Sequence, residues 1–280
     1  MKILVLGAGG LVGSALDQLP DTVGLERQTL DITDFDAVKR AVDVHRPNAI
    51  INAAAQAGVD HADQYPEDTR LVNATAVGHL ATVCSQAGVR MVHLSTDYVL
   101  DNAGIARLKE TEKPNPRSVY AKTKLEGEYL ALECDAVVVR LQWVYQPGER
   151  GFFNHAMREM RAGRNIRLVT DQVGCPTPAS LLAPVLIEMA KSGPTGLFHL
   201  ATQGEATAWD WIKAGAQVLG VPFHAVEAKR CDFSGAHRPA RSCLDSGLVA
   251  RHWKMELPNW ERALHTVAQS GDRMGYGKNT

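Results

Sequence analysis

The fold is decided by the stretch Lys2-Ile3-Leu4-Val5-Leu6-Gly7-Ala8-Gly9-Gly10-Leu11-Val12-Gly13. Its aliphatic first part is typical of a parallel strand that is buried on both faces. The glycines that follow have the spacing G-x-x-G-x-x-G, a variant of the dinucleotide-binding fingerprint. In that fingerprint Gly7 permits the tight turn, Gly10 lets a pyrophosphate approach the backbone, and Gly13 lets the helix pack closely on the strand. Ordinary turn chemistry is the plainer alternative.

The predicted second strand, Thr22–Glu26, ends where a bound dinucleotide would place its adenosine ribose. Glu26 could accept hydrogen bonds from ribose hydroxyls, as in NAD sites, whereas Arg27 could pair with the 2′-phosphate of NADP. Both residues are present, so the sequence leaves the choice between NADPH and NADH open. Asp31 follows at a position suited to the edge of the adenine ring.

Strands and helices alternate along the chain, which predicts an α/β fold with a Rossmann-type doubly wound parallel sheet. The further strands are expected at residues 48–55, 89–95, 136–141, 166–170 and 196–201. The helices are expected at residues 11–19, 69–84, 119–132, 152–161, 179–191, 208–219 and 258–267, and a further helix capped by Thr33 or Asp34 is expected to continue through Val38 and Val42. Turns or loops are expected at residues 101–104, 146–151 and 171–177, and a frayed tail after residue 270.

The pattern of the sequence changes after Trp143, where a smaller C-terminal substrate-binding lid domain is expected to begin. We expect residues 1–145 plus about 168–202 to form the dinucleotide-binding domain, and about 146–167 plus 203–280 to form the smaller one. Ligands of such sheets bind at the carboxyl ends of the strands, which the lid would cover.

Tyr120 and Lys124 are four residues apart at the start of a predicted helix, so they share one face. An ammonium group beside a phenol favours the phenolate and lowers a pKa that is otherwise about 10. Such a tyrosine suits proton transfer at a carbonyl or hydroxyl carbon. Thr96 ends the fourth strand at the same edge of the sheet, where its hydroxyl could hold the reacting oxygen. A half-buried helix tyrosine and a capping threonine are the alternatives.

Composition narrows the possible roles. The formal charge is −1 and 45% of residues are hydrophobic, which predicts a sizeable core and no global basic field for nucleic acid. No stretch is long enough to cross a membrane, and the apolar N-terminus lacks a cleavage site. The five cysteines are scattered without C-x-x-C, and the ten histidines show no ligand spacing, so we expect reduced thiols in the cytoplasm and no metal.

The motifs together resemble an extended short-chain dehydrogenase/reductase, and more narrowly the dTDP-4-dehydrorhamnose reductase family. The strongest matches are Ser95-Thr96-Asp97-Tyr98-Val99 and Tyr120-x-x-x-Lys124 with Gly127-Glu128. Further matches are residues 30–34, Pro47 with residues 51–55, Val59-Asp60, Arg140 with residues 143–145, Asp171-Gln172, Gly174, Pro176-Thr177, and Arg238-Pro239 with Ser242 and Leu244. The resemblance spans the chain from Met1 to about His265.

The resemblance implies reduction of the C4 ketone of a nucleotide-linked 6-deoxyhexose by NADPH, with NADH as the alternative. It implies that Tyr120 supplies the proton, that Thr96 bonds the same oxygen, and that Lys124 also bonds the nicotinamide ribose. The predicted cofactor-binding residues are Gly7, Gly10, Leu11, Val12, Arg27, Asp31, Ile32, Ala53, Ala54, Ala55, Tyr120 and Lys124. The predicted substrate-binding residues are Val59, Thr96, Tyr98, Trp143 and Arg241. For Trp143 and Tyr98, core packing is the alternative.

The departures from the family pattern concentrate on the substrate side. Ala57 stands where the family usually has threonine, Gln142 where it has serine, and Gln146 where it has glycine. Arg241 replaces an asparagine and could pair with a diphosphate, or simply be a solvated surface arginine. Ser180 stands near the place of a glutamate that helps some members bind a metal at a dimer interface, so no such metal is expected.

Other functions in the same family stay open. Another nucleotide-sugar reductase or an epimerase would use the same residues. A non-catalytic NADP-binding subunit, like the regulatory subunit of methionine adenosyltransferase, also resembles this family, although Tyr120 and Lys124 are both present here. The expected partner is the ketosugar substrate, and neither nucleic acid nor a membrane is expected. Assembly into a homodimer is left open by the sequence.

Overall fold

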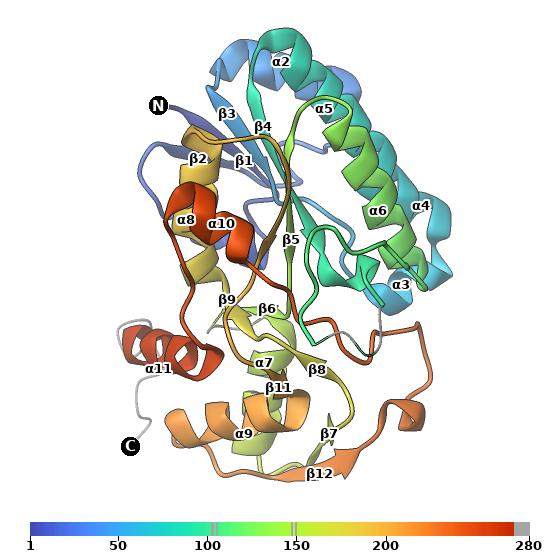
Figure 1. Cartoon of the computed structure of the whole chain (residues 1–280), viewed down its shortest axis with the longest axis vertical. Helices are drawn as coiled ribbons and strands as arrows, with labels where there is room; N and C mark the ends of the chain where they lie inside the picture. Colours follow the sequence, from blue (N-terminus) through green and yellow to red (C-terminus); the bar gives the residue numbers. More distant parts are fainter. Residues whose placement is uncertain (102–103, 105, 147, 149, 272–280) are drawn as a thin grey trace.

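A six-stranded parallel sheet forms the centre of the computed structural model, which describes residues 1–101, 104, 106–146, 148 and 150–271 (Figure 1). The strand order is β10-β5-β4-β3-β1-β2, and every neighbouring pair is parallel. The strands are β1 (Ile3–Leu6), β2 (Thr22–Leu25), β3 (Ala49–Asn52), β4 (Arg90–Thr96), β5 (Val137–Leu141) and β10 (Gly196–Leu200). The chain goes from β1 to β2 on one side and then to β3 on the other, which makes the switch point where such sheets bind ligands.

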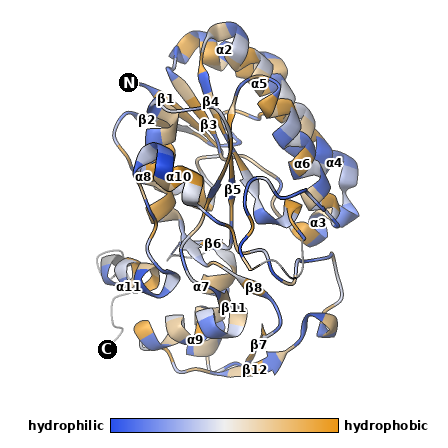
Figure 2. Cartoon of the chain, in the orientation of Figure 1, coloured by the Kyte–Doolittle hydropathy of each residue, from blue (hydrophilic) through white to orange (hydrophobic). Residues whose placement is uncertain are grey.

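Helices cover both faces of this sheet, as Figure 1 shows, and the predicted doubly wound fold is confirmed. On one face lie α1 (Leu11–Asp17), α8 (Ala179–Lys191) and α10 (Gly247–Trp253). On the other lie α2 (Phe35–His45), α5 (Ala76–Ala87) and α6 (Val119–Leu132). The strands are apolar along their length because both faces are buried, which Figure 2 shows as a hydrophobic centre.

Local sequence explains where the important helices begin. Asp34 accepts a hydrogen bond from the Ala37 N–H at 2.9 Å and so caps α2. Ser118 accepts from the Ala121 N–H at 3.2 Å and caps α6, which has the predicted bounds. Because Ser118 fixes the first turn of α6, it also fixes the place of Tyr120 in that turn.

The predicted helix over residues 69–84 is interrupted. It consists of α4 (Pro66–Arg70), the π-helical turn η1 (Leu71–Thr75) and α5. The π turn presents the backbone oxygen of Asn73 to Gly127 on α6, where a Cβ would lie 2.1 Å from it. The Asn73 side chain bonds both backbone groups of Gln56, at 2.8 and 3.0 Å, so the turn also holds the segment after β3.

A smaller group of elements packs below the sheet in Figure 1 around its own apolar cluster, which includes Tyr145, Phe153, Met157 and Trp211. Its helices are α7 (Gly151–Arg161), α9 (Ala208–Val218) and α11 (Trp260–Gly271), and its strands β7 (Ile166–Val169) and β12 (Ala225–Ala228) pair in parallel. Short strand pairs lie between the two groups: β6 (Val144–Tyr145) with β9 (Thr177–Pro178), and β8 (Val173–Gly174) with β11 (Ala206–Thr207). The predicted division of the chain into domains stays a prediction.

Several elements were not foreseen from sequence: α3 (Val59–Gln64), α10, β12 and the 3-10 turns η2 (Asp97–Val99) and η3 (Arg230–Asp232). Each is short, so periodicity gives it little signal. The predicted turns at residues 101–104 and 146–151 and the tail after residue 270 fall partly outside the described residues. No helix in the described ranges is both long and apolar enough to span a membrane.

Candidate active site

The glycine turn between β1 and α1 has the close contacts that its sequence predicts. Gly7 has φ +78°, and a Cβ there would lie 2.6 Å from the Ala54 backbone nitrogen. A Cβ on Gly13 would lie 2.1 Å from the Gly7 oxygen. Gly10 is the N-cap of α1, so the N–H groups of Leu11 and Val12 are among those that begin the helix without a partner inside it. This cradle of small residues and open N–H groups fits a pyrophosphate.

The adenosine end of the predicted cofactor site also suits its ligand. Arg27 lies just after β2 with an exposed side chain, and its Nε is 3.4 Å from Asp31 Oδ2. Asp31 accepts from the N–H and the hydroxyl of Thr33, at 2.9 and 2.7 Å, and these bonds, helped by Arg27, lower the pKa of its carboxyl. Ile32 is buried beneath them. Ala53 and Ala54 follow β3 and are half-buried, so a ligand can lie against that backbone.

Replacing Gly13 by alanine is expected to lower the free energy of unfolding by about 1–3 kcal/mol, because the new methyl group overlaps the Gly7 oxygen. The turn must move to relieve the overlap, so NADPH affinity should fall as well. Urea denaturation and quenching of protein fluorescence by NADPH measure the two effects. Gly9→Ala, whose methyl group would lie 3.4 Å from the Glu26 side chain, is the control for stability. Equal stabilities of the two variants would contradict the predicted overlap.

Tyr120 and Thr96 are brought together, although they come from α6 and the end of β4. The Thr96 side chain interacts with the Tyr120 phenol, and the ring of Tyr98 meets that of Tyr120 edge-on with centroids 5.8 Å apart. The Thr96 oxygen accepts from the Tyr98 N–H at 3.2 Å, and its hydroxyl donates to Asp97 Oδ1 at 3.1 Å. The Thr96 hydroxyl is therefore fixed beside the phenol.

The expected effect of Lys124 on Tyr120 is not seen in this arrangement. Burial raises the pKa of Tyr120 to about 12, and the group that opposes this shift is Thr96. The Lys124 Nζ instead donates to the Leu94 carbonyl at 2.7 Å and lies 3.4 Å from His93 Nε2. Burial lowers the pKa of Lys124 itself to about 8. The lysine is thus directed at the sheet, because β4 presents an acceptor there.

A buried polar cluster lies behind Thr96. Asp97 Oδ2 accepts from Ser242 Oγ at 2.5 Å and from Gln142 Nε2 at 3.1 Å. The Gln142 oxygen accepts from the Cys175 N–H at 3.1 Å. Burial raises the pKa of Asp97 to about 6 despite these bonds. Gln142, which departs from the family pattern, therefore joins four segments beneath the site rather than facing the cavity.

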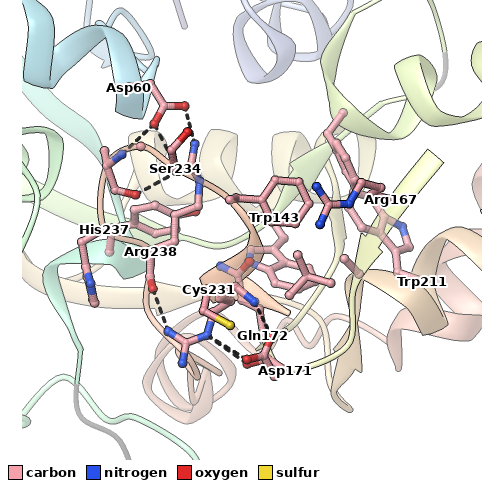
Figure 3. Close-up of a pocket in the computed structure, with 18 of the residues that line it drawn as sticks. Asp60, Trp143, Arg167, Asp171, Gln172, Trp211, Cys231, Ser234, His237 and Arg238 are labelled. Carbon is pink, nitrogen blue, oxygen red and sulfur yellow. Dashed lines mark hydrogen bonds and ion pairs between the residues drawn. The ribbon is translucent and has the colours of Figure 1, made fainter. Parts of the chain in front are cut away.

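A cavity of about 820 Å³, with Tyr98 in its lining, extends between the sheet and the smaller group of elements. Figure 3 shows the residues that surround it. Its lining includes the aromatic rings of Trp143, Phe152, Trp211 and Phe233. It also includes the guanidinium groups of Arg167, Arg230 and Arg238, and Arg167 lies over the Phe233 ring. Such a cavity suits a ligand that carries both a ring system and a strong negative charge.

Trp143 is one of the residues that line this cavity, and its predicted contact with the sugar stays a prediction. Its backbone has φ +39°, a strained value for a non-glycine residue, and its ring lies over Gly174, where a Cβ would be 2.5 Å from the indole. Trp211 supports it from behind, with ring centroids 6.0 Å apart. The strain places the indole over the cavity, next to Tyr98, which also lines it.

Arg241 and Val59 do not line the cavity. The Arg241 guanidinium forms an ion pair with Glu205 and contacts the Ala106 carbonyl, because the bridge between Val173 and Arg241 places it beside β8. The predicted diphosphate contact of Arg241 is therefore not supported. Sequence reasoning missed the arginines that do line the cavity, although the locally basic run after residue 223 was a signal for Arg230 and Arg238.

Arg238 joins two segments that line the cavity through its ion pair with Asp60. Its Nη2 lies 2.7 Å from Asp60 Oδ2, and Asp60 Oδ1 also accepts from the Ala236 N–H at 2.8 Å. These bonds lower the pKa of Asp60. Figure 3 shows this pair at one end of the cavity. Asp171, which also lines the cavity, accepts from the Arg230 N–H at 2.8 Å. The bonds to Asp60 hold the segment that carries Arg238 against α3, the helix that follows β3.

Comparison with known proteins agrees with these features. The family model described as the RmlD substrate binding domain matches residues 1–272. The chain is 35% identical over 275 residues to a dTDP-4-dehydrorhamnose reductase of Mycolicibacterium smegmatis, covering 94% of this chain and 84% of that protein. It is 33% identical over 271 residues to a dTDP-4-keto-6-deoxy-D-glucose reductase of Streptomyces niveus, covering 91% and 94% of the two.

A solved structure is similar along the whole chain. It is a dTDP-4-dehydrorhamnose reductase from Bacillus anthracis in complex with NADP, with a TM-score of 0.91 and 25% identity, covering 96% of this chain and all of that one. The sheet, the glycine turn and the pairing of Thr96 with Tyr120 agree with this likeness. By the match over nearly its whole length, this chain belongs to the RmlD substrate binding domain family.

Proposed function

We propose that the protein uses NADPH to reduce the C4 ketone of a dTDP-linked 6-deoxyhexose, as its relatives are named for doing. The observation that carries the proposal is that Thr96, at the carboxyl end of β4, interacts with the phenol of Tyr120 on α6. This supports a proton donor and a second hydroxyl that act on one substrate oxygen.

The nicotinamide supplies the hydride when the cofactor is bound, and the protein supplies the rest. Negative charge grows on the ketone oxygen, and Tyr120 gives that oxygen its phenolic proton. The raised pKa of Tyr120 keeps the phenol protonated at neutral pH, which is the form that a reduction consumes. Thr96 can donate a second hydrogen bond to the same oxygen when its single O–H turns from Asp97 Oδ1 to the substrate, while the Tyr98 N–H holds its oxygen in place.

The cavity supports recognition of the nucleotide part. Arg230 and Arg238 are suited to a diphosphate, since guanidinium groups bind its oxygens by charge-assisted hydrogen bonds. Phe233 lies under the Arg167 guanidinium at 4.8 Å, and Trp211 is close by, so this end suits a planar base. We assign the sugar to the end at Tyr98 and Trp143, next to Tyr120.

Arg27→Ala is expected to reduce the preference for NADPH over NADH by about 10-fold or more, because it removes the cation nearest the 2′-phosphate. The KM for NADH should change little. Initial rates with each nucleotide give the ratio of the two kcat/KM values. Arg40→Ala, an exposed arginine on α2, is the control. An unchanged ratio in Arg27→Ala would show that another group selects the cofactor.

The function is tested by offering dTDP-, UDP- and GDP-linked 4-ketosugars with NADPH or NADH and following nicotinamide absorbance. Stoichiometric oxidation of NADPH with the dTDP-linked sugar is the expected result. Conversion of the sugar without net oxidation would assign an epimerase instead. Flat traces with every sugar, together with co-purification of a larger enzyme, would assign a non-catalytic subunit.

Two further inferences concern the cellular compartment of the protein and its oligomeric state. The scattered free cysteines suit a reducing cytoplasm, where nucleotide-sugar chemistry would take place. A homodimer is expected from the family resemblance alone, and sedimentation of the purified protein measures it.

A further inference from the structure

A buried histidine lies between the predicted catalytic lysine and the sheet. His93 is in β4 and is fully buried, directly opposite Asn52 of β3 in the strand register. Its Nδ1 lies 3.2 Å from the Asn52 amide nitrogen, and its Nε2 lies 3.4 Å from Lys124 Nζ. The mechanism proposed above does not use this side chain.

The directions of the hydrogen bonds that run from Ala54 through Asn52 to His93 follow from the Ala54 N–H. The Ala54 N–H can only donate, and it lies 3.1 Å from Asn52 Oδ1. The Asn52 amide nitrogen therefore faces His93 Nδ1 and donates to it, so Nδ1 must carry a lone pair. Burial and the nearby Lys124 hold the pKa of His93 well below its usual range, so the ring is neutral. Its one proton is therefore on Nε2.

The Nε2–H of His93 then points at Lys124 Nζ. An amine has a lone pair to accept this hydrogen bond, whereas an ammonium has none and is repelled. Lys124 also lacks an ion-pair partner among the described residues. Glu128, one turn along α6, is bound by Arg140 at 2.7 Å and by Ser95 at 2.5 Å.

We propose that His93 is a positioning residue that acts through Lys124: held by Asn52 as the Nε2–H tautomer, it favours the amine form of that lysine. It thereby sets the pH at which Lys124 changes charge, in the same direction as burial, which lowers the pKa of Lys124 to about 8. The other titratable groups around Lys124 are Tyr120 and Glu128 on α6, the latter with its partner Arg140 on β5. The catalytic consequence rests on the proposed function.

The tautomer can be measured without substrate or cofactor. In protein with ¹⁵N-labelled histidine, two of the ten imidazoles, those of His93 and His199, should stay neutral between about pH 5 and 9. The His93 ring should carry its proton on Nε2, whereas the His199 ring should carry it on Nδ1, which faces the Leu108 carbonyl. His93→Gln assigns the His93 signal by removing it. Asn52→Asp provides a second test, because its carboxylate accepts a hydrogen bond and should move the proton to Nδ1. A wild-type His93 protonated on Nδ1 would overturn the proposal, whether or not the protein reduces any sugar.

The effect on Lys124 is measured by the pH profile. In His93→Gln the amide oxygen can turn to Lys124 and accept from the ammonium, which raises the pKa of the lysine. The alkaline fall of kcat/KM for dTDP-4-dehydrorhamnose with NADPH should move up by about one pH unit. His79→Gln, which changes an exposed histidine on α5, is the matched control.

An unmoved alkaline limb in His93→Gln, or an equal loss of kcat/KM at every pH, would overturn the proposal. If the wild-type protein showed no turnover, that result would instead count against the proposed function. The tautomer of His93 would then test the positioning role by itself.

Discussion

Tyr120→Phe is expected to lower kcat for the ketosugar by about 10²–10⁴-fold, which is the usual contribution of a positioned general acid. The phenylalanine ring keeps the edge-on contact with Tyr98 but has no proton to give to the ketone oxygen. The KM for the sugar should change little, because the proton is needed only as charge develops in the transition state. Steady-state rates with NADPH at neutral pH measure both constants.

Tyr129→Phe is the control for this substitution. It makes the same chemical change two turns further along α6, on an exposed side chain far from the described contacts of the site. Its kcat should stay within about twofold of the wild-type value. If Tyr120→Phe lost less than about tenfold in kcat, another group would be the proton donor and the proposed mechanism would be wrong.

Arg140→Met is expected to lower the free energy of unfolding by about 3–5 kcal/mol, because it leaves the Glu128 carboxylate buried without its partner. Arg140 and Glu128 are 2% and 1% exposed, and the pair is joined at 2.7 Å. Ser95 also donates to the carboxylate, but a single hydroxyl does not replace a bidentate cation. Urea denaturation at neutral pH measures the loss.

The same helix provides a matched control. Glu126 forms an ion pair with Arg70 at 2.6 Å, but these side chains are 37% and 55% exposed. Arg70→Met should therefore cost far less stability than Arg140→Met, because water solvates the remaining carboxylate. The double variant Arg140→Met with Glu128→Leu should recover part of the lost stability. Equal losses for the two arginine variants would show that burial is not what makes the Arg140 pair important.

Local sequence accounts for most of the elements that place the cofactor. The aliphatic run before Gly7 becomes β1, and the glycine spacing becomes the turn, because each depends on residues adjacent in the chain. Helix α6 has its predicted bounds because Ser118 caps it and a helix-forming run follows. The interruption at η1 could not be predicted, since its cause is the close approach of Gly127 on another helix.

The sequence by itself determined that a tyrosine and a lysine share one face of α6, and that Thr96 ends a strand at the same edge of the sheet. Only the tertiary structure decided what each of them contacts. The register of β3 against β4 sets Asn52 opposite His93, and so turns Lys124 toward the sheet. The physical reason is that these contacts join residues far apart in the chain, whose meeting depends on packing and strand register rather than on local periodicity.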